Sequence, residues 1–103
     1  MELPQDEMLL ELFGEFVDQW LTDVNAQYDD FVAAKDTVDF YRFAHTLKGS
    51  GYQFGIQPLG DRGIELMALI KAEDWEKIPA YKKLLLDILN DAKESYDEWV
   101  AKQ

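Results

Sequence analysis

Apolar side chains recur along this chain at spacings of three and four residues, which is the pattern of helices that each bury one face. One such stretch covers residues 6–34 and a second covers residues 36–54. A third covers residues 57–71, and the last is clear from Tyr81 onward, with Pro79 either beginning it or making its first turns irregular. No segment keeps a period of two, so the sequence predicts no strand.

Four amphipathic helices with short connections predict an all-α protein, folded as an antiparallel up-down four-helix bundle in a single domain, residues 1–103. Gly14 could separate a short extra N-terminal helix from the main first helix. Asp36 is a favourable N-cap for the second helix, and Gly55 is a favourable stop after it. The expected core stripes comprise Leu9, Phe13, Phe16, Val17, Trp20, Val24, Tyr28, Phe31, Phe40, Phe43, Ala44, Leu47, Gly51, Phe54, Leu59, Gly63, Ile64, Met67, Ile70, Leu85, Ile88, Leu89, Ala92, Tyr96, Trp99 and Val100.

The charge balance limits the classes of partner that the chain can bind. The chain carries 21 acidic and 10 basic side chains, a formal net charge of −11, so nucleic acid and anionic membranes would repel it. The acidity serves solubility, or it steers the chain toward a basic patch on a protein partner. There is no cysteine, which excludes disulfides and thiolate zinc sites. With no signal peptide and no apolar run near the ~20 residues of a membrane span, we expect a cytoplasmic protein.

The only histidine, His45, lies within the second predicted helix. On a helical projection it falls about 140° from the centre of that helix's core stripe, so it should face water. The residues that share or flank this face are Val38, Tyr41, Arg42, Lys48, Gly49 and Tyr52. Two tyrosines, a valine and a glycine are an unusual composition for a solvated helix face, and they indicate a docking surface.

The residues around His45 suit a transferable phosphoryl group. An exposed imidazole can act as a nucleophile. Lys48, one turn further on, could pair with an anion carried by the ring. Gly49 leaves room beside the ring for a bulky tetrahedral group, and as a mid-helix glycine it costs about 1 kcal/mol relative to alanine, which calls for a reason.

Other interpretations of these residues stay open at this point. A lone surface histidine usually has no special role, and a lysine or glycine taken singly is most often a solvated cation or a helix-packing residue. A metal site is disfavoured, because one histidine without cysteine lacks an obvious ligand set. No Ser/His/Asp arrangement can be assigned, and no phosphate-binding glycine loop is present.

The stretch His45-Thr46-Leu47-Lys48-Gly49-Ser50, with Gly55 ten residues after the histidine, resembles the signature of the histidine-containing phosphotransfer (HPt) domains of multistep two-component phosphorelays. That signature is His-x-Leu-Lys-Gly-[Ser/Ala] followed by the later glycine. Ala44 before the histidine and the Ile64-Glu65 region downstream also look like the family. Gly51 and Tyr52 depart from it, because many members have small residues such as alanine there, and this departure concerns local packing.

The resemblance implies a four-helix bundle in which His45 is phosphorylated on Nε2. The phosphoryl group would come from an aspartate of one receiver domain and pass to an aspartate of another. Lys48 would then be the cation near the phosphoryl group, Gly49 the steric clearing, and Gln57 a further residue near the site. Docking would involve Val38, Tyr41, Arg42 and Tyr52.

By the same resemblance the protein has no ATP-binding or kinase activity of its own and no cofactor, since Mg²⁺ belongs to the receiver. Its partners would be response-regulator receiver domains, a hybrid sensor histidine kinase, or both, and we expect a monomer. Two alternatives remain. One is a non-catalytic helical adaptor or dimerisation module that uses the same face, and the other is the HPt segment of a larger sensor kinase.

Overall fold

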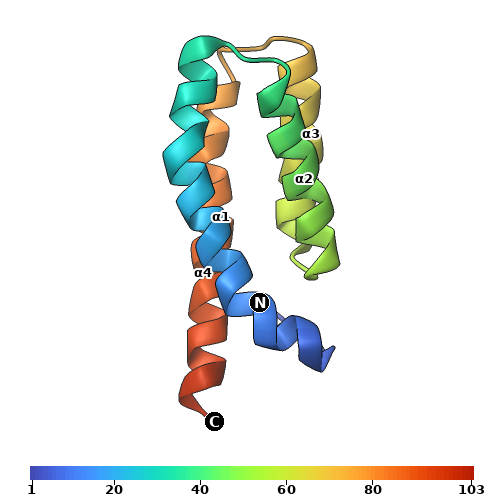
Figure 1. The fold of residues 1–103 in the computed structure, drawn as a ribbon, viewed down its shortest axis with the longest axis vertical. Helices are drawn as coiled ribbons and strands as arrows, with labels where there is room; N and C mark the ends of the chain where they lie inside the picture. The colour runs from blue at the N-terminus through green and yellow to red at the C-terminus, as the bar shows by residue number, and fades with distance from the viewer.

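The computed structural model describes residues 1–103 and contains four α-helices and no strand. The helices are α1 (Glu7–Ala34), α2 (Asp39–Gln53), α3 (Gln57–Lys71) and α4 (Tyr81–Ala101), with a 3-10 turn, η1 (Ile78–Ala80), before α4. They run alternately up and down as an antiparallel bundle (Figure 1), which confirms the predicted fold class. None of the four combines the length and apolar character that a membrane crossing requires.

Aspartates accept backbone hydrogen bonds at or just before the starts of α1 and α2, as their short acceptor side chains favour. Asp6 accepts hydrogen bonds at Oδ1 from the backbone N–H of Met8, at 2.9 Å, and of Leu9, at 3.2 Å. Asp36 accepts from Val38 and Asp39, at 3.0 and 2.8 Å, in the turn that leads into α2, but the N-cap of α2 is Val38 and not Asp36 as predicted.

Glycines allow α2 and α3 to pack in close contact. A Cβ on Gly51 would lie 2.8 Å from the backbone nitrogen of Gly60, and one on Gly63 would lie 2.9 Å from Cα of Lys48. Real Cβ atoms are not found at such distances from backbone atoms. The expectation that Gly51 lets a neighbouring helix approach is therefore confirmed, and α2 and α3 form one tight hairpin.

Aromatic rings separate that hairpin from the packed pair of helices α1 and α4. The space between the two pairs of ribbons in Figure 1 is filled by rings from α1 that meet rings from α2. Their centroids are 3.9–5.4 Å apart in the pairs Phe16–Phe54, Tyr28–Phe40, Phe31–Phe40 and Trp20–Phe43. Large side chains set a wide spacing between helices. This aromatic layer also fixes which face of α2 turns inward and therefore which face is left for solvent.

Two predicted core residues are wrong. Ile64 is 49% exposed, and Leu66, two positions on and about 160° round the helix, is fully buried in its place. The cause is that α3 is turned to place Gly60 and Gly63 against α2, which rotates Ile64 outward. Val100 is 47% exposed because α4 continues past the end of the α2–α3 hairpin (Figure 1), where no helix covers its stripe.

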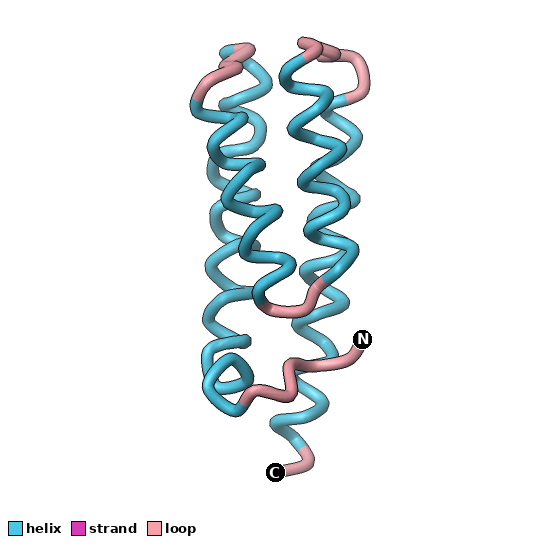
Figure 2. The backbone as a smooth tube through the Cα atoms, turned by 90° about the vertical axis from the view of Figure 1, so that its right-hand side faces the viewer, coloured by secondary structure: helices cyan, strands magenta, loops and turns pink.

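The N-terminal region forms no separate short helix, because α1 is continuous from Glu7 to Ala34. Its first turns instead bend aside (blue in Figure 1), and the residues before it pass below the turn that joins α2 to α3 (Figure 2). Gly14 has a packing role: a Cβ there would lie 2.6 Å from the ring of Tyr96, so the glycine lets α4 lie close to α1. Pro79 lies in the 3-10 turn, which makes the approach to α4 irregular.

Candidate functional site

Five of the eight predicted site residues line one shallow depression on the outer side of α2: Val38, Tyr41, Arg42, His45 and Lys48. Met67 of α3 completes the lining. The sequence had assigned Met67 to the core stripe of its helix, and the structure leaves it half-buried at the edge of this depression. The candidate site is therefore shared by two helices.

His45 lies exposed near the middle of α2, as the helical projection predicted. Its neighbours Ala44 and Leu47 are fully buried in the core, so the backbone that carries the imidazole is held firmly. The ring makes no hydrogen bond to any other residue and no ion pair with a carboxylate. The imidazole is thus exposed to solvent and has no polar partner within the chain.

Lys48, three residues after His45, is a cation without a carboxylate partner. Arg42 on the same face forms an ion pair with Asp39, at 3.6 Å, whereas Lys48 forms none, although acidic side chains outnumber basic ones two to one. The start of the Lys48 side chain lies against Gly63 of α3, which fixes its direction of departure. The ammonium group is available to an anion placed near His45.

Gly49 differs from the other five glycines of the chain. Four of them have a packing role, because a Cβ on any of them would meet another side chain or the backbone within 3.0 Å, and Gly55 has a φ of +76° that favours glycine. A Cβ on Gly49 would meet nothing within 4 Å, and its φ is not positive. The residue therefore leaves open space one turn after His45. It lowers helix stability by about 1 kcal/mol relative to alanine, and neither a packing contact nor a backbone conformation explains that loss.

Tyr52 is held at the seam between α2 and α3. Its ring lies over Gly60, where a Cβ would come within 2.4 Å, and its hydroxyl donates to Oδ1 of Asp61 at 2.6 Å. That hydrogen bond favours the neutral phenol and raises the pKa of Tyr52. Neither Gly60 nor Asp61 was predicted as part of this surface, because each is identified only by the register of α3 against α2.

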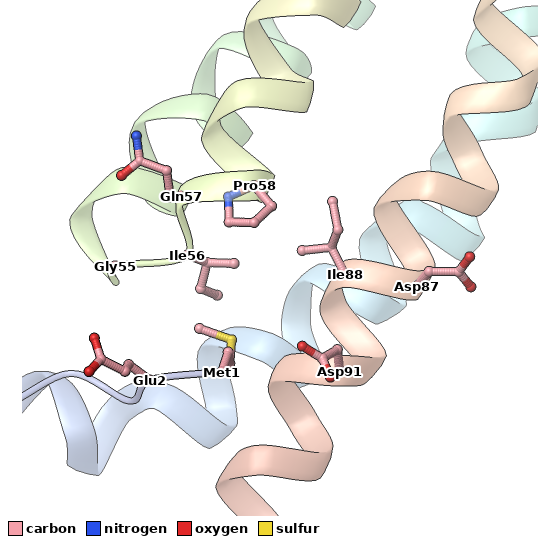
Figure 3. A pocket seen from close by; sticks show the side chains of 9 residues that line it. All are labelled: Met1, Glu2, Gly55, Ile56, Gln57, Pro58, Asp87, Ile88 and Asp91. Carbon is pink, nitrogen blue, oxygen red and sulfur yellow. The ribbon is translucent and has the colours of Figure 1, made fainter.

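Gln57 is not brought to His45. It begins α3 and lines a different hollow near the N-terminal residues and α4 (Figure 3). Because Gly60 lies beside Gly51, the start of α3 is level with the end of α2, about 14 Å from His45 along the helix axis. The placement does not support a role for Gln57 at the histidine.

Ile64 is a surface residue that sequence reasoning missed. It follows Gly60 by four positions and precedes Met67 by three, so it shares their side of α3. Since Gly60 lies under Tyr52 and Met67 lies beside His45, Ile64 borders the same surface. The sequence signal was ambiguous, because an isoleucine at helical spacing is more often buried.

Comparison with protein-family models, with curated proteins and with solved structures gave no match. The chemistry of the site therefore rests on its own residues. An accessible imidazole can accept a tetrahedral anion, and an unpaired ammonium group one turn away can neutralise its charge. The open space beside the ring can accommodate it. No three histidine, aspartate or glutamate side chains gather closely enough to hold a metal ion.

Proposed function

We propose that this protein is a phosphorelay intermediate of the HPt type, which accepts a phosphoryl group on His45 from a receiver-domain aspartate and passes it to another receiver. The observation that carries the proposal is Gly49, a mid-helix glycine with neither a packing nor a backbone reason, next to an exposed histidine. The unpaired Lys48 and the match of residues 45–50 to the family signature support it.

The transfer step needs little from this chain beyond presentation of the ring. Nε2 of neutral His45 attacks the phosphorus of the aspartyl phosphate in line with the scissile P–O bond, the N–P bond forms, and the aspartate leaves as a carboxylate. The reverse attack, by a carboxylate of the second receiver, returns the free imidazole. Lys48 offsets negative charge on the phosphoryl oxygens, and Gly49 leaves them room.

In this proposal the protein binds no ATP and holds no cofactor, and Mg²⁺ is supplied by the receiver domain. The partners are response-regulator receivers, a hybrid sensor histidine kinase, or both, and the relay runs in the cytoplasm with the protein as a monomer. The acidic surface is consistent with a protein partner, since it repels nucleic acid and anionic lipid.

The direct test mixes purified protein with radiolabelled, phosphorylated receivers and follows transfer of the label. We expect a phosphorylated species that is stable in alkali and labile in acid, and that is absent from His45→Gln. His45 is exposed and makes no hydrogen bond or ion pair, so circular dichroism and thermal unfolding of the variant should match the unmodified protein. If no label reaches His45 from any of several cognate receivers, the proposal fails.

A second candidate is a helical adaptor that uses the same face for binding alone. The observation in its favour is the exposed apolar surface near the histidine, where Val38 is 66% exposed. In that case His45→Gln would keep both partner binding and cellular function, whereas a relay protein would lose function and keep binding.

A further inference from the structure

The exposed apolar residues around His45 extend toward α3. Tyr52 and Val38 of α2 are exposed, Met67 of α3 is half-buried beside the histidine, and Ile64 is nearly half exposed. We call the surface formed by Val38, Tyr41, His45, Lys48 and Tyr52 of α2 with Ile64 and Met67 of α3 the α2–α3 face. The carboxylate of Asp61, which borders this face, already accepts the hydrogen bond from Tyr52.

Charge is divided very unevenly between the α1–α4 helix pair and the α2–α3 hairpin. Together α1 and α4 carry twelve acidic and three basic side chains, a formal charge of −9. The α2 and α3 helices carry three acidic and four basic side chains, a formal charge of +1. All seven ionisable acids of α1 occur without a single lysine or arginine on that helix. The α2–α3 hairpin is therefore the one part of the bundle that an acidic surface can approach without strong repulsion.

The two edges of α2, one toward α1 and one toward α3, also differ in charge. On the α1 side, the groove beside Arg42 is lined by the carboxylates of Asp23 and Asp39 over aromatic rings. On the α3 side, Lys48 and Met67 line the same depression as the histidine, and Ile64 is exposed on the same side of α3 as Met67. An aspartyl phosphate is strongly anionic, so the surface that presents it meets less repulsion on the α3 side.

Screening of charges by salt preserves this difference in electrostatic repulsion between the two sides. The bundle measures 19 and 17 Å across its two shorter axes, and the Debye length at physiological ionic strength is about 8 Å. A partner seated on the α2–α3 face is separated from most of the α1 and α4 charges by more than that length. It therefore senses mainly the near-neutral hairpin and Lys48.

We propose that the receiver domain docks on the α2–α3 face, with Ile64 as its apolar anchor on α3 and with an acidic receiver surface around the phosphorylated aspartate. The inference rests on the proposed function and adds to it the side of His45 from which the partner approaches. Apolar anchors near the centre of an interface carry a large share of binding energy, and neighbouring charges select the partner.

The experiment replaces Ile64 with side chains of opposite charge and measures receiver affinity by titration, together with the rate of phosphotransfer. Ile64→Glu should weaken receiver binding by about tenfold or more, and Ile64→Lys should weaken it less. Leu84→Glu is the matched control, because Leu84 is a 42% exposed leucine on α4, and it should change affinity less than about twofold. Both positions are exposed, so all three variants should fold, which circular dichroism checks.

The outcomes separate this inference from the function on which it rests. If the unmodified protein takes no label from receivers, the proposed function itself fails. If the unmodified protein is labelled and Ile64→Glu binds and transfers equally well, the receiver docks elsewhere and the α2–α3 face is refuted. If Ile64→Lys weakens binding as much as Ile64→Glu, the acidic receiver surface is refuted. An equal loss in Leu84→Glu would also refute the assigned face.

Discussion

Replacing Gly49 with alanine should stabilise the fold while it hinders the chemistry. The added Cβ meets no atom within 4 Å, and the backbone already has ordinary helical geometry. The only remaining term is intrinsic helix propensity, which favours alanine by about 0.8–1.0 kcal/mol at an exposed interior position. For a domain near this size, 1 kcal/mol raises Tm by about 4–8 °C.

Gly63→Ala is the contrasting variant on the facing helix. It has the same gain in propensity, but its Cβ would lie 2.9 Å from Cα of Lys48, a backbone atom that cannot move aside cheaply. Overpacking of this kind costs about 1–3 kcal/mol, so the net change is a loss of up to about 2 kcal/mol. The two glycine-to-alanine changes should therefore move stability in opposite directions.

Urea unfolding followed by circular dichroism measures both free energies, and the receiver assay measures transfer. Gly49→Ala should slow transfer a few-fold, and Gly49→Gln, whose side chain fills the space beside the ring, should slow it by about tenfold or more while keeping the gain in stability. A loss of stability in Gly49→Ala would refute the open-space interpretation. A stabilised Gly49→Gln protein that transfers at the normal rate would refute the clearing role.

Three further changes test the charge, the core and the buried phenol. Lys48→Ala keeps the Cβ that faces Gly63 and removes only the cation, so phosphotransfer should slow about tenfold while the free energy of unfolding changes by less than about 0.5 kcal/mol. The control, Lys102→Ala at the far end of α4, should transfer at the normal rate. Leu47→Ala removes a fully buried side chain and should cost about 2–5 kcal/mol by urea unfolding, with His45 still labelled below the transition. Burial raises the pKa of Tyr28, so the folded state holds that proton more tightly than the unfolded chain, and stability should fall as pH rises above about 10. Tyr28→Phe should flatten that alkaline decline in a pH series of thermal unfolding, and an unchanged slope would show that another group causes it.

Helix positions and the outward face of α2 were accessible from the chain alone. Periodic apolar residues locate a helix and its buried side, and His45, opposite that side, is exposed as the projection requires. That Asp36 accepts backbone hydrogen bonds near the start of α2 was also predictable, because a short acceptor side chain before a helix satisfies free N–H groups locally. Such features depend on residues within a few positions of one another.

The errors arose where a second helix decides the outcome. Ile64 matched an apolar stripe, yet the close contact of Gly60 and Gly63 with α2 rotates it outward. Val100 continues the stripe of α4, but no helix reaches that far to cover it. An apolar stripe shows which residues of one helix share a side, but burial also requires a neighbouring helix at the same height along the bundle.

The sequence by itself determined the helices, the exposure of His45 and the closeness of Lys48 and Gly49 to it, since all three depend on the repeat of a single helix. Only the tertiary structure decided that Met67 lies beside the histidine, that Ile64 is exposed, that Asp61 holds Tyr52, and that Gln57 lies elsewhere. The physical reason is register. Which residues of two helices face each other depends on how their side chains interlock, here on glycines that admit backbone contact, and the pattern of neither helix alone contains that information.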